Sequence, residues 1–217
     1  MSNFSVPRRS LMLGLTAGGA ALALAPAGAF ATTSPDVGKP APLFTAVDRN
    51  GKSWSLADLK GKVVVIETTN HDCPYVRKHY NAKNMQDQQR EAAAKGVVWL
   101  TTASNAAGEQ GAVTPAKANE LTKSRDAAPA AVLIDPQSKI ARAYGATVTP
   151  HMYIIDAKGT LVYKGGIDSI PSSNVADIPK AKQYVRVALD EVLAGKPVTE
   201  ASTQAYGCTM KYPRTST

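Results

Sequence analysis

Residues 63–76 read VVVIETTNHDCPYV and place an apolar run shortly before a cysteine and a proline. The unbroken β-branched run Val63–Ile66 is typical of a central strand that is covered on both faces of a sheet. Pro74 suits the first position of a helix, because the N–H that proline lacks would have no partner there. This stretch therefore predicts a buried strand, a tight turn and a helix that starts directly after Cys73.

Segments typical of strands and helices alternate on both sides of this stretch. Residues 32–42 contain too many Pro and Gly for a regular element, and residues 43–56 predict a hairpin that turns at Asn50-Gly51. The further elements predicted are a long helix over 74–95, a strand over 97–103, a helix over 115–125 capped by Thr114, a strand over 131–134, a short helix over 138–144, strands over 152–155 and 161–163, and a closing helix over 178–192. This order predicts one α/β domain over residues 32–197 whose mixed sheet has helices on both faces. Residues 198–217 show no periodicity and are predicted to form a tail that carries Cys208.

The first 31 residues have the composition of a cleavable export signal. Arg8-Arg9 precede the apolar residues 11–25, and Ala29-Phe30-Ala31 offers small residues at a cleavage site. The arginine pair resembles a twin-arginine signal, but Pro7 and Leu13 depart from that motif, so ordinary secretion stays an alternative. An apolar stretch of about 15 residues is shorter than the roughly 20 that a membrane-spanning helix needs. We expect the export machinery to deliver the chain to the periplasm or otherwise outside the cytoplasm.

Composition excludes several classes of protein. The chain of 217 residues carries 25 Lys and Arg against 17 Asp and Glu. These charges are interspersed and no basic stripe alternates with aromatic residues, so we expect no nucleic-acid partner. Two cysteines are too few for a disulfide-dense scaffold or an all-cysteine zinc site. A functional role is open for Asp168 and Asp177, but the default expectation is that both are surface acids.

Cys73 is the candidate nucleophile. At the start of a helix, unpaired backbone N–H groups and the positive end of the helix dipole stabilise a thiolate, which is the nucleophilic form. His71 and His79 are candidates to assist, whereas Asp72 would oppose the thiolate. The alternative is an inert, buried cysteine.

Several stretches carry a resemblance to a known family. They are GKPAPLF (38–44), DRNGK (48–52), LADLKGKV (56–63), Cys73, YGATVTP (144–150) and DAKG (156–159). Together they resemble redoxin-type proteins of the thioredoxin fold, which include peroxiredoxins and exported thioredoxin-like proteins. The resemblance implies a thioredoxin-like three-layer α/β sandwich with a mixed central sheet and an N-terminal β-hairpin extension. It also implies a thiol-dependent oxidoreductase without a cofactor, whose partners are a thiol or disulfide protein or a peroxide, and an external thiol reductant.

The residues around Cys73 depart from the two main patterns of this family. Val76 stands where thioredoxins carry the second cysteine of Cys-x-x-Cys, so exchange between vicinal thiols is excluded. Asn70 and Ile66 stand where the peroxiredoxin motif has Thr and Pro. The sequences NHDCPYV (70–76) and YGCTMK (206–211) resemble instead a bacterial branch that shares an Asn-His-x-Cys-Pro start and a Gly-Cys-x-x-Lys end.

The resemblance also suggests which residues support the nucleophile. In this fold a cis proline faces the active cysteine, which gives that place to Pro150 and brings the Thr149 backbone beside Cys73. The supporting set expected is Pro74, Thr149, Pro150, Asn70 and His71. His151 is expected either to face the same site or to lie on the surface.

Three fates are open for Cys208. In the leading hypothesis Cys73 attacks a disulfide or peroxide, and Cys208 resolves the product into a Cys73–Cys208 bond, with Gly207 giving the tail freedom. A permanent structural disulfide and two unpaired thiols are the alternatives.

Two other functions remain as hypotheses. A copper-binding or metallochaperone protein would use Cys73 with His71, His79 or His151, although Arg77 stands where copper proteins of this fold have a second cysteine. The other hypothesis is a catalytically silent binding module that keeps a structural disulfide.

Overall fold

The computed structural model describes residues 1–3 and 34–214. Most of the predicted export signal, residues 1–31, therefore lies outside the described residues. Within the described ranges, no helix is both long enough and apolar enough to cross a membrane.

A five-stranded mixed sheet forms the centre of the domain. The strands, in spatial order, are β5 (Ala131–Ile134), β4 (Val98–Ala103), β3 (Val64–Thr68), β7 (His151–Ile155) and β8 (Leu161–Gly165). β3 runs parallel to β4 and antiparallel to β7, and every residue of β3 is buried. The prediction of a central strand shortly before Cys73 is therefore confirmed, with bounds shifted by one or two residues.

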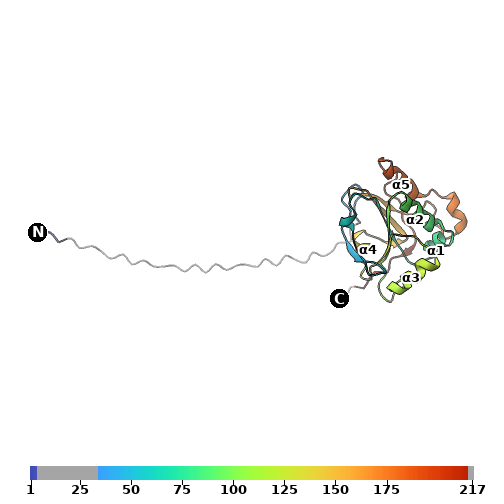
Figure 1. Cartoon of the computed structure of the whole chain (residues 1–217), viewed down its shortest axis with the longest axis horizontal. Coiled ribbons are helices and arrows are strands. Elements are labelled where there is room, and N and C mark those ends of the chain that lie inside the picture. The colour runs from blue at the N-terminus through green and yellow to red at the C-terminus, as the bar shows by residue number, and fades with distance from the viewer. Residues whose placement is uncertain (4–33, 215–217) are drawn as a thin grey trace. The chain divides into compact units, whose positions relative to one another are not determined.

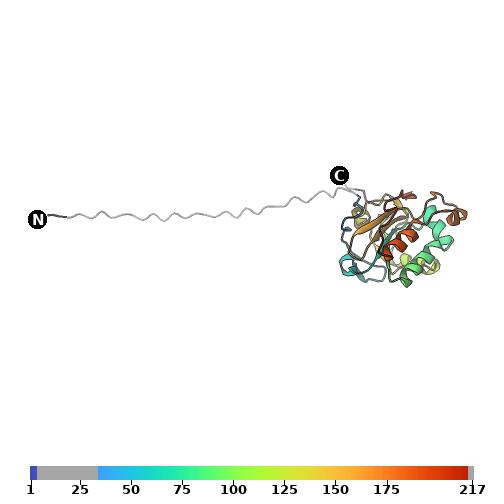
Figure 2. The ribbon, with the colours of Figure 1, turned by 90° about the horizontal axis from the view of Figure 1, so that it is seen from above.

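Helices cover both faces of this sheet. α1 (Pro74–Asn81), α2 (Asn84–Ala94) and α5 (Tyr184–Leu193) lie together on one face (Figure 1, Figure 2), where their apolar side chains pack with Val65 and Trp99. α4 (Lys139–Ala143) and the 3₁₀ helix η1 (Leu56–Leu59) pack on the opposite face.

The expected N-terminal hairpin and the third helix are also present. β1 (Thr45–Val47) pairs with β2 (Ser53–Ser55), and their turn is bridged to the sheet edge through Asp48 and Leu133. α3 (Pro115–Ser124) begins after Thr114, whose hydroxyl accepts a hydrogen bond from the backbone N–H of Lys117 at 3.2 Å. The predicted cap of this helix is thus confirmed.

The prediction of one helix over residues 74–95 is wrong, because two helices meet at Ala82-Lys83. Lys83 has a φ of 59°, in the left-handed region, which redirects the chain without a Gly or Pro. The side chain of Gln86 reaches back from α2 and donates a hydrogen bond to the carbonyl oxygen of Tyr80 at 2.9 Å. Tertiary hydrogen bonds of this kind stabilise a break that helix periodicity alone does not reveal.

The closing helix also starts later than predicted, at Tyr184 instead of residue 178. Residues Val175–Lys180 form the 3₁₀ helix η2, which contains Pro179. Because proline has no N–H to donate within a helix, the apolar spacing from Ile178 onward does not make one α-helix.

The segment after residue 197 is packed on the domain as far as it is described. β9 (Cys208–Thr209) pairs with β6 (Val148–Thr149). The side chain of Tyr206 is buried in the hydrophobic cluster on one face of the central sheet, and that of Met210 in the cluster on the other face. The absence of periodicity before Cys208 therefore reflects an irregular path along the protein and not a lack of structure.

Candidate functional site

Cys73 lies between β3 and α1, at the N-terminus of the helix. It is the N-cap residue of α1, and Pro74 follows as the first helical residue. Its side chain is fully buried, and the thiol donates a hydrogen bond from Sγ to the carbonyl oxygen of Thr149 at 3.1 Å. The structure therefore brings together the cysteine and the threonine backbone that the sequence analysis pairs.

Asn70 shapes the turn that presents Cys73. Its side-chain Oδ1 accepts a hydrogen bond from the N–H of Asp72 at 2.9 Å, and its backbone oxygen accepts one from the N–H of Cys73 at 3.1 Å. Its amide Nδ2 lies 3.5 Å from the carbonyl oxygen of Gln110, to which it donates. Asn70 thus binds backbone groups on both sides and supports the turn, while the thiol itself is held by Thr149.

Cys208 lies beside the same threonine. The peptide bond between Thr149 and Pro150 is cis, and Thr149 is the strand partner of Cys208 in the β6–β9 pair. Gly207, with a φ of 147°, permits this approach, because a Cβ built on it would lie only 1.9 Å from the Thr149 carbonyl oxygen. Gly207 therefore allows the tail to lie close against Thr149. The sequence suggests a different role, in which the glycine gives the tail freedom to move.

The two thiols are neighbours, and neither is in a disulfide in this structure. Cys208 is half-buried, and its burial, a hydrogen bond to Cys73 and the charge of Cys73 raise the pKa of the Cys208 thiol to about 12. At neutral pH Cys208 is therefore a protonated thiol that can donate a hydrogen bond toward Cys73.

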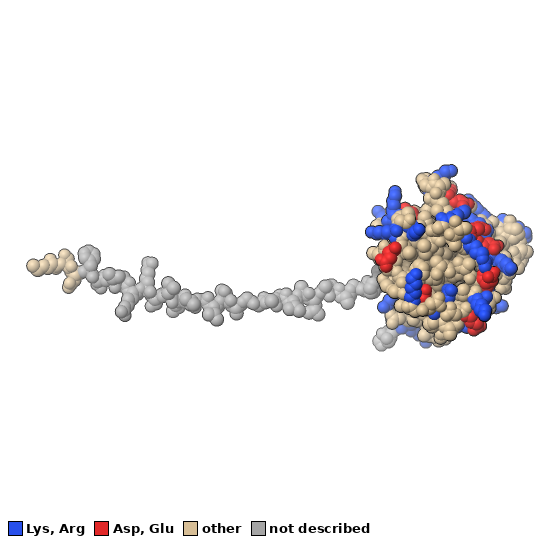
Figure 3. Space-filling model, viewed as in Figure 1, with Lys and Arg blue, Asp and Glu red and all other residues tan. Residues whose placement is uncertain are grey.

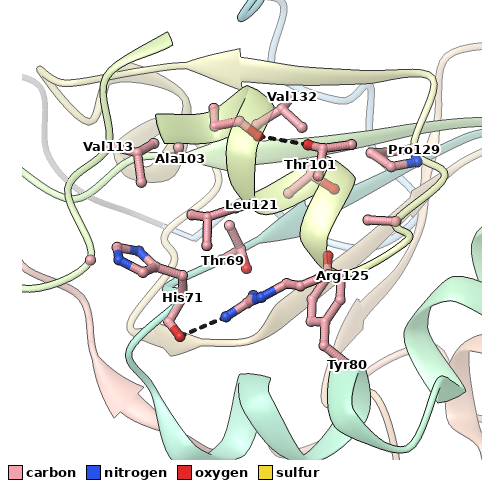
Figure 4. Close-up of a pocket in the computed structure, with 14 residues that line it drawn as sticks. Thr69, His71, Tyr80, Thr101, Ala103, Val113, Leu121, Arg125, Pro129 and Val132 are labelled. Carbon is pink, nitrogen blue, oxygen red and sulfur yellow. Dashed lines mark hydrogen bonds between the residues drawn. The ribbon is translucent and has the colours of Figure 1, made fainter. Parts of the chain in front are cut away.

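His71 lies at a small pocket beside this site, together with Thr69 and Arg125 (Figure 4). The Arg125 guanidinium donates a hydrogen bond to the backbone oxygen of His71 at 2.8 Å and lies over the ring of Tyr80. Burial lowers the pKa of the His71 imidazole. The side chain of His71 pairs with Asp72 at 3.5 Å, so the structure gives it a place at the pocket and no hydrogen bond to the described atoms of Cys73.

His79 and His151 are buried in separate surroundings. His79 contacts Asn84 through Nδ1 at 2.9 Å and the hydroxyl of Tyr206 through Nε2 at 3.4 Å. His151 stacks on Tyr153 with ring centroids 4.6 Å apart, so the alternative of a surface histidine is wrong. Burial lowers the pKa of each histidine to about 4.

The four residues named for a metal are not assembled into one site. Among residues 1–3 and 34–214, no group of three or more His, Cys, Asp or Glu side chains is close enough to hold a metal ion. Both ring nitrogens of His79 already have partners, which leaves no lone pair free for copper.

The comparison with family models identifies the chain. The model described as the AhpC/TSA family matches residues 37–164. The chain belongs to the AhpC/TSA family. A comparison with curated proteins found no match.

Solved structures extend the likeness beyond the family segment. An uncharacterized conserved protein from Geobacillus kaustophilus is 28% identical with a TM-score of 0.74, over 83% of this chain and 94% of its own. A hypothetical protein from Sinorhizobium meliloti 1021 is 25% identical with a TM-score of 0.70, over 83% of this chain and 97% of its own. A putative thiol:disulfide interchange protein DsbE from Chlorobium tepidum is 24% identical with a TM-score of 0.50, over 60% and 85%. The last likeness concerns the fold alone. The redoxin-type resemblance and the thioredoxin-like α/β fold are confirmed.

Two buried polar clusters were missed by the sequence analysis of this AhpC/TSA-family chain. One centres on Asp168, which is fully buried and paired with Lys78, so the expectation that Asp168 is a surface acid is wrong. The other centres on Glu67, whose carboxyl oxygens accept hydrogen bonds from Tyr80, Gln89, Trp99 and Thr101. Asp177, in contrast, binds Ser172 and Lys180 near the surface. The partners in both buried clusters are far apart in sequence, so spacing gives no signal for them.

Proposed function

We propose that this protein is a thiol-dependent oxidoreductase in which Cys73 is the nucleophile and Cys208 the resolving thiol. The observation that carries the proposal is that Thr149 holds both cysteines, one by a 3.1 Å hydrogen bond and the other by strand pairing. Two thiols beside one carbonyl form a pair that a two-electron oxidant can join. The AhpC/TSA family and the thioredoxin-like fold support the same class of reaction.

With a disulfide substrate, the reaction proceeds by two exchanges. The Cys73 thiolate attacks one sulfur, forms a mixed disulfide and expels the other sulfur as a thiolate, which takes up a proton. Cys208 then loses its proton, attacks Sγ of Cys73 and expels the second substrate sulfur as a thiolate, which takes up that proton. The substrate gains two electrons, the Cys73–Cys208 disulfide stores the oxidised state, and an external thiol reductant returns it to two thiols.

With a peroxide substrate, the same pair of cysteines suffices. The Cys73 thiolate attacks one peroxide oxygen, gives a sulfenic acid and releases an alcohol or water. Condensation of the sulfenic acid with Cys208 forms the disulfide and releases water. Asn70 stands where peroxiredoxins carry a threonine, and its side chain is hydrogen-bonded to backbone groups. We therefore favour disulfide exchange over peroxide reduction as the main reaction.

Access to the sulfur requires a local opening. Cys73 is fully buried, and Gly207 and Cys208 lie against Thr149, whose carbonyl oxygen accepts the hydrogen bond of the Cys73 thiol. The β6–β9 pair contains two residues in each strand, and such a short pairing opens at small cost in free energy.

Single-turnover kinetics with the two cysteine variants test this function. Reduced protein is mixed with a small aromatic disulfide in one arm and with hydrogen peroxide in the other. We expect Cys73→Ser to abolish both reactions, and Cys208→Ser to stop at a mixed disulfide or a sulfenic acid. Equal rates for Cys73→Ser and wild type in both arms would contradict the proposal. The ratio of the two wild-type rates identifies the oxidant.

We propose in addition that residues 1–31 direct export, residues 32–197 form the redoxin domain and residues 198–217 carry the resolving cysteine. The paired Arg8-Arg9 and the apolar residues that follow support export. Cell fractionation of the full chain and of an Arg8→Lys, Arg9→Lys variant tests the route. Loss of export in the double variant identifies the twin-arginine route, and unchanged export indicates ordinary secretion.

A further inference from the structure

A buried ionic cluster joins the two cysteine-bearing segments, and the proposed chemistry makes no use of it. Lys78, on α1, donates a hydrogen bond from Nζ to Asp168 Oδ2 at 3.2 Å, and both side chains are 0% exposed. The hydroxyl of Tyr206 donates a hydrogen bond to the other carboxylate oxygen, Asp168 Oδ1. Lys78 also donates to the carbonyl oxygen of Ile170 at 3.3 Å. Lys78 lies five residues after Cys73, and Tyr206 lies two residues before Cys208.

The hydrogen bonds of the Tyr206 hydroxyl are fully accounted for. Asn84 can only donate through Nδ2, so Nδ1 of His79 accepts and the neutral imidazole carries its proton on Nε2. That N–H faces the Tyr206 oxygen at 3.4 Å, and Nζ of Lys78 approaches the same oxygen at 3.5 Å. The hydroxyl therefore accepts from both and donates to Asp168. An arrangement in which every donor and acceptor is matched specifies one position for the tyrosine.

The position of Tyr206 sets the position of Cys208 relative to α1. The pairing of Cys208 with Thr149 ties the cysteine to β6, and the Tyr206 cluster ties the backbone two residues before it to the helix that Cys73 caps. Farther upstream, Thr203 binds β8 through the backbone oxygen of Lys164 at 3.1 Å. Tyr206 is thus the anchor between the β8 edge and the resolving cysteine.

We propose that Tyr206, held by Asp168 and Lys78, is a positioning residue that keeps Cys208 in place to attack the oxidised form of Cys73. This inference rests on the proposed function, since it concerns the resolving step. The hydroxyl of Tyr206 is hydrogen-bonded to Asp168, Lys78 and His79, and among the described residues it has no hydrogen bond to either sulfur, so we assign its role to the second exchange and not to the first attack. Holding a nucleophile in register raises its effective concentration, and loss of a hydrogen bond to a charged partner reduces that gain by about tenfold or more.

The variant that isolates this role is Tyr206→Phe. It removes one hydroxyl and keeps the ring, which packs edge-on against Tyr75 with centroids 5.7 Å apart. The ion pair of Lys78 with Asp168 stays, so no buried charge is left alone. Tyr75→Phe is the matched control, because it removes the hydroxyl of the neighbouring ring and leaves the cluster intact. Thermal unfolding followed by circular dichroism establishes that both variants are folded.

Stopped-flow and quenched-flow kinetics with an aromatic disulfide separate the two steps. Release of the first aromatic thiol reports the attack by Cys73, and release of the second reports resolution by Cys208. We expect Tyr206→Phe to keep the first rate within about twofold, to slow the second at least about tenfold and to accumulate the mixed disulfide on Cys73, while Tyr75→Phe matches wild type.

Two outcomes would overturn the inference. An unchanged second rate in Tyr206→Phe shows that β6–β9 pairing alone positions Cys208. Equal slowing of both steps shows that the hydroxyl acts through general stability. In either case the wild type still forms the Cys73–Cys208 disulfide, whereas failure of the proposed function would show in the wild type as a mixed disulfide that never resolves.

Discussion

At the scale of single residues, Gly207 determines whether Cys208 can lie beside Thr149. A Cβ on residue 207 would meet the carbonyl oxygen of Thr149 at 1.9 Å, and the φ of 147° is a strained angle for any residue with a side chain. The approach of the two thiols therefore depends on a missing methyl group, in addition to the hydrogen bonds of the threonine.

The variant Gly207→Ala should separate the β6–β9 pair. We expect a loss of about 1–3 kcal/mol in the free energy of unfolding and at least tenfold slower formation of the Cys73–Cys208 disulfide. Gly195→Ala is the control, because φ is also positive there at 69° but no atom lies within 4 Å of the added carbon. Urea denaturation and the rate of thiol loss check both effects. Normal disulfide formation in Gly207→Ala would show that the close approach is not needed.

Burial of the Asp168–Lys78 ion pair increases the loss in the free energy of unfolding that follows removal of one partner. Replacing it with alanine leaves the ammonium of Lys78 buried without a counter-charge, and we expect a loss of about 3–5 kcal/mol in the free energy of unfolding. Asp190→Ala is the matched variant, because it removes the exposed pair with Lys95 and should cost less than about 1 kcal/mol. Urea denaturation measures both, and equal losses would contradict the buried assignment.

At the scale of elements, the break between α1 and α2 depends on a lysine in a conformation that favours glycine. Lys83 has a φ of 59°, and a side chain at that angle costs about 1–2 kcal/mol. The chain tolerates this cost because the break lets Asn84 contact His79 and Gln183.

The variant Lys83→Gly should therefore stabilise the protein. We expect a gain of about 1 kcal/mol in the free energy of unfolding, since glycine adopts a positive φ without strain. The neighbouring Ala82→Gly, at a φ of −88°, should instead lose about 1 kcal/mol, because glycine there only adds freedom to the unfolded chain. Equilibrium denaturation compares them, and a loss in both variants would contradict the strain at residue 83.

At the scale of the whole molecule, the sheet, the helix that starts after Cys73 and the N-terminal hairpin follow from local patterns. The apolar run Val63–Ile66 predicts a buried strand, and Pro74 indicates the start of a helix. The break at Lys83 and the cluster around Asp168 depend on partners distant in the chain, for which one sequence carries no spacing signal. Pro179 did carry a local signal, which the apolar spacing obscured.

The candidate site divides in the same way. The place of Cys73 and the neighbourhood of Thr149 could be expected from the residues and the family resemblance. The contact between Cys208 and Cys73 could only be a hypothesis from the sequence, because no local pattern says where an irregular segment lies. Figure 3 shows Lys and Arg interspersed with Asp and Glu on the face in view, in keeping with the scattered charges of the sequence.

The stability of the whole molecule should depend on pH through Glu67. Burial raises the pKa of this carboxyl despite four hydrogen-bond donors, so the folded protein keeps a proton that the unfolded chain releases above about pH 4.5. The stabilisation from Glu67 is therefore full below that pH and is lost as the pH rises through the folded pKa. Glu67→Gln keeps a hydrogen-bonding amide in place and should remove this decline.

The free energy of unfolding measured from pH 4 to pH 8 checks this effect. We expect the wild type to lose stability relative to Glu67→Gln as the pH rises, and the exposed Glu109→Gln to follow the wild type. Parallel curves for wild type and Glu67→Gln would show that the buried carboxyl titrates as it does in the unfolded chain.

The central claim is that Cys73 and Cys208 form one redox pair. Non-reducing peptide mass mapping of residues 32–217, after reaction of the reduced protein with one equivalent of oxidised glutathione, tests it most directly. The account predicts one peptide pair joined by a Cys73–Cys208 disulfide, with no glutathione attached and with full reversal by an added dithiol. Two unmodified thiols, or glutathione retained on Cys73 beside a free Cys208, would contradict it.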